Sequence, residues 1–232
     1  MNNDTNDIFN SEFSRQYDAY NAAMDAISHN LHLLISILLR DLPEDARILC
    51  VGVGTGSEIV RLAETHPGWR FTGVAPSPDM LAVCAEKLQR KGLSERCMLT
   101  EGYLGDMPVS GDYDAALCLL VTHFIQSDTR NGIYQQMHAQ LLPGAKMITA
   151  EIAGDMAAQD FEEKLVAWAG MHSLASNTKR TPQELKAQME QRLLLLPPEQ
   201  TERLITASGF LTPQRFFQSL LIHGWVATKP AN

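Results

Sequence analysis

Three glycines at alternate positions are the residues of this sequence best suited to chemistry. Gly52, Gly54 and Gly56 follow the apolar run 46–51 and precede a helical pattern that begins at Ser57. Glycine lets a backbone turn tightly and approach a ligand closely, and the free amides of a helix N-terminus attract polar groups. A strand, a glycine turn and a helix in this order predict a nucleoside site. The GxGxG spacing disfavours a dinucleotide pyrophosphate site, which uses GxGxxG.

A predicted α/β sheet places these glycines at the end of a strand. Short apolar runs alternate about five times with helical patterns, which predicts a parallel sheet with helices on both faces. Ser77, Pro78 and Asp79 form a strong helix start, because Ser caps free amides and Pro fits the first helical position. We expect strands at 46–51, 70–74, 97–100, 113–120 and 146–151, and two final strands at 210–221 and 221–229.

Helical segments flank this core on both sides in the sequence. Residues 14–40 carry apolar side chains at helical spacing, and residues 156–196 show helical patterns without a strand signal. Thr181 and Glu184 form a capping box within the second segment. We therefore expect one domain over 1–232, with a helical cap at 1–43, a nucleoside-binding core at 46–152, a helical lid at 153–196 and a final helix with two strands at 197–232.

Composition excludes several classes of protein. The chain has 232 residues, 45% hydrophobic, and a net charge of -8, which argues against broad contact with nucleic acid. The polar N-terminus is unlike a signal peptide, and the longest apolar run, 31–39, is too short to span a bilayer. The four cysteines form no CxxC pair, so neither zinc nor disulfides are expected. We expect a cytoplasmic monomer or homodimer that has no metal, nucleic-acid or membrane partner.

Four motifs, in their order and intervals, resemble the successive motifs of class I S-adenosylmethionine-dependent methyltransferases. They are ILCVGVGTG, FTGVAPSPDML, YDAALCLLVTHF and QLLPGAKMITAE, and they cover about 46–151. The resemblance implies a doubly wound, Rossmann-like sheet of seven strands, the last antiparallel, flanked by helices. It implies S-adenosyl-L-methionine as cofactor, bound across the carboxyl ends of the first strands, and methyl transfer to a small-molecule acceptor.

The resemblance also assigns positions along the cofactor. The turn glycines match residues under its amino acid moiety, and Ala75 matches the position whose carboxylate holds both ribose hydroxyls. The other matched positions are Pro76, Ser77 and Met80 along the ribose and adenine, Leu120 after the fourth strand, Tyr103 near the adenine, and Tyr17 on a helix that folds over the cofactor mouth.

Three positions depart from the family pattern. Cys50 replaces the usual acid of the first strand, Ala75 replaces the ribose acid, and Tyr103 stands where an Asp commonly meets the adenine amine. A hydrogen bond to a charged partner contributes about 1.5–3 kcal/mol, so the missing ribose acid weakens cofactor binding by about one to two decades. Tyr103 either stacks on the adenine as a partial replacement or is a simple loop aromatic, and Asp106 either accepts from the ligand or serves its own turn.

Two residues are candidates for a general base. His123 follows the fourth strand, at the rim where a substrate nucleophile is expected, and Glu151 ends the fifth strand, where it can face the same cavity. The alternatives are a packing histidine and a solvated carboxylate. His172, on the apolar face of the insertion, is a better core residue than a catalyst.

Two other functions stay open. The insertion is also similar to that of carboxy-S-adenosylmethionine synthases, although Lys186 falls about where that group places a carboxylate-binding Arg. A non-catalytic relative that keeps the fold for ligand sensing fits the missing acids at Cys50 and Ala75. The intact glycine turn opposes this second alternative.

Overall fold

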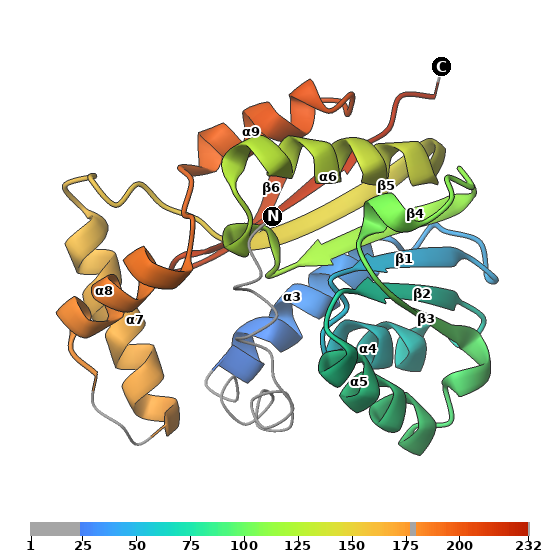
Figure 1. Cartoon of the computed structure of the whole chain (residues 1–232), viewed down its shortest axis with the longest axis horizontal. Helices are drawn as coiled ribbons and strands as arrows, with labels where there is room; N and C mark the ends of the chain where they lie inside the picture. Colours follow the sequence, from blue (N-terminus) through green and yellow to red (C-terminus); the bar gives the residue numbers. More distant parts are fainter. Residues whose placement is uncertain (1–23, 177–179, 232) are drawn as a thin grey trace.

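The computed structural model describes residues 24–176 and 180–231, so the expectations for Tyr17 and the rest of 14–23 lie outside the described residues. One seven-stranded sheet runs through the molecule in the order β3-β2-β1-β4-β5-β7-β6 (Figure 1). The first five strands are parallel, and β7 is antiparallel to both β5 and β6. The strands are β1 Arg47–Val51, β2 Arg70–Ala75, β3 Cys97–Glu101, β4 Tyr113–Leu119, β5 Leu141–Ile152, β6 Gln214–Ser219 and β7 Ile222–Thr228. The predicted fold class is confirmed.

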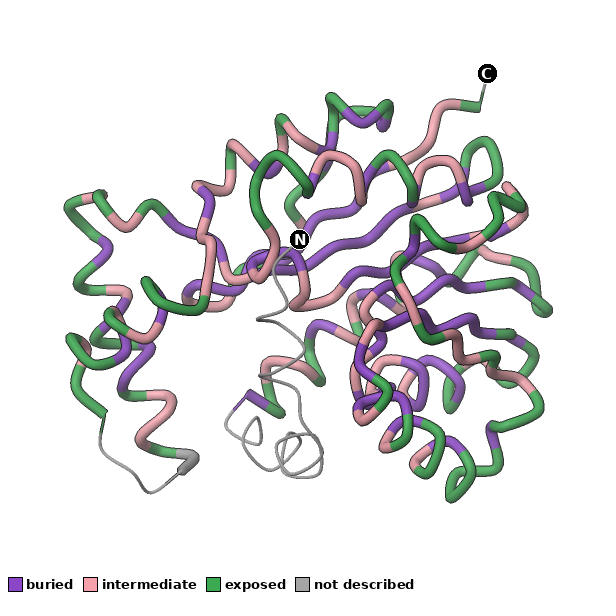
Figure 2. The backbone as a smooth tube through the Cα atoms, viewed as in Figure 1, coloured by how far each residue is buried: buried purple, intermediate pink, exposed green. Residues whose placement is uncertain are grey.

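Helices cover both faces of this sheet. They are α3 Asp25–Leu38, α4 Ser57–Thr65, α5 Pro78–Arg90, α6 Ser127–Gln140, α7 Phe161–Ser176, α8 Pro182–Arg192 and α9 Pro198–Ala207. One apolar core joins the sheet to α3, α4, α5, α7 and α8, and a second joins its other face to α6 and α9. The central strands are accordingly buried along most of their length (Figure 2).

Local sequence signals fix where several helices begin. The Ser77 hydroxyl accepts a hydrogen bond from the Met80 amide at 3.3 Å, which caps α5 as predicted. Thr181 and Glu184 exchange side-chain and backbone hydrogen bonds of 3.2 and 2.8 Å at the start of α8, so the predicted capping box is confirmed. Gly56, with φ of 73°, is the N-cap of α4.

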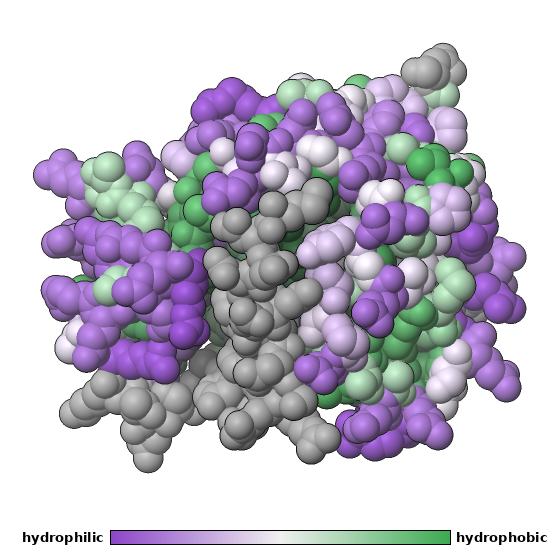
Figure 3. All heavy atoms as spheres, in the orientation of Figure 1, coloured by the Kyte–Doolittle hydropathy of each residue, from purple (hydrophilic) through white to green (hydrophobic). Residues whose placement is uncertain are grey.

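The helical insertion packs away from the glycine turn. Its α7 and α8 bury Phe161, Leu165 and Leu185 in the same core as Leu221 and Ile222, at the β6–β7 hairpin. Figure 1 shows the pair on the far side of α3 from α4 and α5. In the face shown in Figure 3, the outer surface of this pair is mostly hydrophilic. The insertion therefore packs at the β6–β7 hairpin, beside the carboxyl end of β5.

Two glycines differ in the space around them. A Cβ on Gly68, in the loop before β2, would lie 2.2 Å from the backbone oxygen of Glu44. A Cβ on Gly132, within α6, would meet nothing within 4 Å. The first glycine is required by close backbone packing, whereas the second only weakens its helix.

We predict that these two sites respond to alanine in opposite directions. Gly68→Ala should lower the free energy of unfolding by about 1–3 kcal/mol, because backbone must move to admit the methyl group. Gly132→Ala should raise it by about 0.5–1 kcal/mol, because alanine is the better helix former. Urea denaturation of both variants measures the difference, and a Gly68→Ala variant as stable as the wild type would contradict the packing described here.

Candidate functional site

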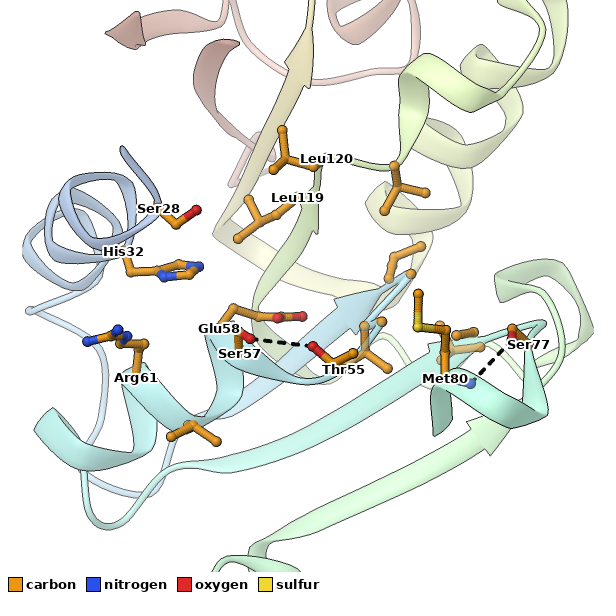
Figure 4. Close-up of a pocket in the computed structure, with 18 of the residues that line it drawn as sticks. Ser28, His32, Thr55, Ser57, Glu58, Arg61, Ser77, Met80, Leu119 and Leu120 are labelled. Atoms are coloured by element: carbon orange, nitrogen blue, oxygen red, sulfur yellow. Dashed lines mark hydrogen bonds between the residues drawn. The ribbon is translucent and has the colours of Figure 1, made fainter. Parts of the chain in front are cut away.

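A cavity of about 750 Å³ lies at the carboxyl ends of the parallel strands β1, β2 and β4. This edge is where open α/β sheets bind ligands. Figure 4 shows polar side chains of α3 and α4 on one side and apolar side chains after β4 on the other. Most of the lining comes from residues within 51–58 at the end of β1, 74–80 at the end of β2, 102–104 after β3, 119–125 at the end of β4, and 24–32 at the start of α3, and the rest comes from α4, α5 and α6.

The glycine turn forms the part of the cavity next to β1. Gly52, Gly54 and Gly56 all have positive φ, of 68°, 52° and 73°. A Cβ on Gly52 would lie 2.5 Å from Cγ2 of Val121, and one on Gly56 would lie 2.5 Å from Sγ of Cys84. The left-handed backbone and the close packing together require glycine at these two positions.

Gly54 differs from its two neighbours because it faces open space. Among the described residues, the nearest atom to a Cβ placed there is the Gly52 oxygen, at 3.9 Å, and Gly54 lines the cavity. A ligand can therefore approach this backbone more closely than any side chain would allow.

Lys87 of α5 holds the turn in place. Its ammonium donates hydrogen bonds to the hydroxyls of Thr55, at 3.0 Å, and Ser57, at 3.1 Å. Sequence reasoning missed this contact, since Lys87 reads as a surface residue of an amphipathic helix. The turn is thus anchored from the neighbouring βα unit as well as by β1.

Every predicted cofactor residue within the described chain except Gly56 lines the cavity. These residues are Gly52, Gly54, Ala75, Pro76, Ser77, Met80, Tyr103 and Leu120, while Gly56 supports the turn from behind. Asp106 does not line it, because its carboxylate accepts from the Tyr103 amide at 2.9 Å and so serves the turn. Contact of the lining residues with a cofactor stays a prediction.

Leu120 marks strain at the cavity wall. It has φ of 58°, a conformation that costs a non-glycine residue energy. Its amide donates to the Ala150 carbonyl at 2.6 Å, which holds the chain in this turn as β4 ends.

His123 and Glu151 lie below the cavity, which corrects the rim position expected for them. They are 2% and 0% exposed, and neither lines the cavity. The Nδ1 atom of His123 accepts from the Ile152 amide at 3.2 Å, and burial, helped by the Arg130 charge, lowers the pKa of His123 to about 3. Neither side chain is in position to take a proton from a molecule in the cavity.

Glu151 instead centres a buried polar network. Its carboxylate pairs with the Arg130 guanidinium at 3.2 Å and accepts from the Thr122 hydroxyl at 2.5 Å. It also accepts from the Thr201 hydroxyl, and Arg130 donates further to the Leu194 carbonyl. A buried carboxylate needs such partners, and here they come from three separate segments, those of Thr122, Arg130 and Thr201.

The predicted lid does not cover the turn within the described chain. No described residue of 153–196 lines the cavity; this includes His172, on α7, and Lys186, on α8. The start of α3 lies there instead, with Met24, Asp25 and Leu31 in the wall. The described part of the N-terminal cap therefore supplies the wall that was expected from both segments.

Sequence reasoning missed a polar wall made by α3 and α4. Ser28 and His32 on α3 face the same space as Glu58 and Arg61 on α4 (Figure 4). Burial lowers the pKa of His32 to about 4 and raises that of Glu58 to about 7. The Nδ1 atom of His32 is buried and has no hydrogen-bond partner among the described residues. The i, i+4 spacing of Ser28 and His32 was the available signal.

Residues 24–176 and 180–231 offer neither a metal site nor a membrane-spanning helix. They contain no group of three or more His, Cys, Asp or Glu side chains arranged to hold a metal ion. No helix there combines the length and apolar character needed to cross a membrane.

Comparison with known proteins finds a family that part of this sequence matches and solved structures that share this fold. Residues 48–144 match the family described as a methyltransferase domain. A putative O-methyltransferase from Nostoc punctiforme PCC 73102 shares the fold with a TM-score of 0.66 and 18% identity, over 94% of this chain and 59% of that chain. Human N-acetylserotonin methyltransferase in complex with SAM shares it with a TM-score of 0.56 and 16% identity, over 82% of this chain and 49% of that one.

Curated relatives match over a shorter segment. Ribosomal RNA small subunit methyltransferase H of Synechococcus sp. (strain RCC307) is 35% identical over 31% of this chain and 24% of its own length. The chain spans about a quarter of the length of the curated relatives it matches.

We predict that Glu151 acts on stability. Glu151→Gln should lower the free energy of unfolding by about 3–5 kcal/mol, because it leaves the Arg130 charge buried without its counter-ion. Glu190→Gln, at an exposed position of α8, should change it by less than about 0.5 kcal/mol. Thermal and urea denaturation report both variants. A Glu151→Gln variant of normal stability that had lost its activity would restore the catalytic interpretation.

Proposed function

We propose that this chain, whose residues 48–144 match the methyltransferase domain family, transfers a methyl group from S-adenosylmethionine to a small-molecule acceptor. The family match and the seven-stranded fold confirm the resemblance to class I S-adenosylmethionine-dependent methyltransferases and so support this cofactor. The observation that carries the proposal is the left-handed glycine turn, which exposes the Gly54 backbone to a cavity of about 750 Å³ at the carboxyl edge of the sheet.

The residues present fit a nucleoside cofactor. The open space beside Gly54 admits a group close to the backbone, and the buried wall of Ala75 and Met80 suits an apolar ring. The sulfonium of the cofactor supplies an activated methyl group, so alignment with a nucleophile is the main requirement on the protein. Lys87 and the packing of Val121 hold the turn rigid for that alignment.

The wall after β4 supports an acceptor with an apolar body. Leu119, Leu120, Phe124 and Ile125 line the cavity across from the polar side chains of α3 and α4. Such a mixture of one apolar side and a few polar groups is typical of small-molecule sites. The net charge of -8 makes a nucleic-acid acceptor less favourable. Lys186 does not line the cavity, so the site gives no support to a carboxy-S-adenosylmethionine synthase.

The proposal places the chain in the cytoplasm. Its four cysteines are all free thiols, as a reducing compartment favours. Calorimetric titration with S-adenosylmethionine and S-adenosylhomocysteine tests the function before any acceptor is known, because a non-catalytic relative with a lost site binds neither.

We predict that Gly54→Ala weakens S-adenosylhomocysteine binding by at least about tenfold, since the added methyl stands where the ligand meets the backbone. Gly92→Ala is the matched control. Gly92 has φ of 69° and open space around it, but it follows α5 and does not line the cavity. Both variants should lose about 1–2 kcal/mol of stability through the left-handed backbone, and only the first should lose affinity. Equal dissociation constants in calorimetry would contradict a ligand at Gly54.

We predict that the acid missing from β2 can be restored. Ala75→Asp should tighten S-adenosylhomocysteine binding by about tenfold, the low end expected for one added charged hydrogen bond after desolvation. Ala75→Asn controls for size, because it adds the same volume without the charge and should gain less. If Ala75→Asp binds more weakly than Ala75→Asn, position 75 makes room for a ligand of different shape.

A further inference from the structure

Glu58 occupies an unusual place for an acidic side chain. It lies in the first turn of α4, and Figure 4 shows its carboxylate pointing into the cavity below Leu119. Its charge acts on three buried thiols, those of Cys50 in β1, Cys118 in β4 and Cys84 on α5. The carboxylate therefore lies in the cavity at the end of β1, the strand that has Cys50 where the family pattern has an acid.

Among the described residues, the groups around Glu58 supply only a partial counter-charge. Lys87 is the described cation whose charge acts on Glu58, and the Lys87 ammonium already donates to the hydroxyls of Thr55 and Ser57. Burial outweighs Lys87 and raises the pKa of Glu58 to about 7. Other charged or titratable side chains that line the cavity from α3, α4 and α5 are Asp25, His29, His32, Arg61, Glu64 and Lys91.

The neighbouring thiols and His32 do not change their protonation near pH 7. Burial raises the pKa of the Cys84 and Cys118 thiols to about 12, so both stay protonated at neutral pH. The pKa of His32 is lowered to about 4, so His32 stays neutral there. Arg61 lies 3.7 Å from the Asp25 carboxylate on α3, which already supplies it with an anion.

We propose that Glu58 supplies from α4 a carboxylate to the end of β1, where the strand has Cys50 in place of an acid, and that it binds a cationic group of the ligand. This inference rests on the proposed function, because the cation is the ammonium or the sulfonium of S-adenosylmethionine. A cation in contact with Glu58 favours its charged form, so the neutral acid gives its proton to solvent and an ion pair forms. Ligand binding is then linked to proton release.

Calorimetry in two buffers of different ionisation enthalpy counts the released protons. The wild type should release about half a proton per S-adenosylmethionine at pH 7, since Glu58 is then about half protonated before binding. Glu58→Gln should abolish the release and weaken binding by about tenfold or more. Glu86→Gln, on the exposed face of α5, should behave as the wild type. S-adenosylhomocysteine separates the two cations: equal release identifies the ammonium, and a lower release identifies the sulfonium.

The ligand-free protein gives a second measurement. A carboxyl whose pKa is raised in the folded state lowers the free energy of unfolding as it ionises, so its favourable contribution to stability is lost as the pH rises from about 4.5 through about 7. Glu58→Gln should therefore raise the melting temperature relative to the wild type at pH 8 and have little effect at pH 5. An equal effect at both pH values would overturn the environment assigned to Glu58.

The failures of the two proposals are distinguishable. If the wild type binds neither S-adenosylmethionine nor S-adenosylhomocysteine, the proposed function and this inference fall together. If both ligands bind the wild type without proton release, or bind Glu58→Gln as tightly as the wild type, this inference is overturned and the proposed function stands.

Discussion

The buried ion pair between Arg130 and Glu151 is the constraint on which the rest of the site depends. Neither side chain is exposed, so every donor and acceptor has to find a partner within the protein. The partners of Glu151 come from the turn after β4, from α6 and from α9, while Arg130 also holds the return of the insertion at Leu194. These contacts fix the path of the backbone that follows β4.

The path of that chain shapes the cavity. Leu120 is forced into a left-handed turn, and Val121 is placed against the Gly52 backbone. The polar network below thus positions the apolar wall above it, although no network residue reaches the ligand space. A change at Glu151 would act on the site through the position of the β4 end.

The fold and the glycine turn were predictable because their signals are local. Strand and helix periods, the cap at Ser77 and the capping box at Thr181 each depend on a few neighbouring residues.

The positions of His123 and Glu151 were not predictable in the same way. That a residue follows a strand indicates the edge of the sheet at which it lies, but not how deeply its side chain is buried. The partner of Glu151, Arg130, sits in a polar helix pattern that reads as solvent-exposed. The insertion was predicted as a lid because its apolar faces do not reveal which surface they cover. They pack beside Leu221, in the hairpin next to the carboxyl end of β5.

The strand order also dictates when the site can exist during synthesis of the chain. The glycine turn follows β1, but its opposite wall follows β4, and these strands pair through contacts such as Ile48 with Ala115. β5 in turn is completed by β7, through pairs such as Ile148 with Val226 near the end of the chain. Pairings so distant in sequence form slowly, because loop closure precedes any gain from contact. We therefore expect a nascent chain to carry the complete glycine motif long before it gains affinity for its ligand. Ligand binding would then appear only late in folding, once the distant strands have paired.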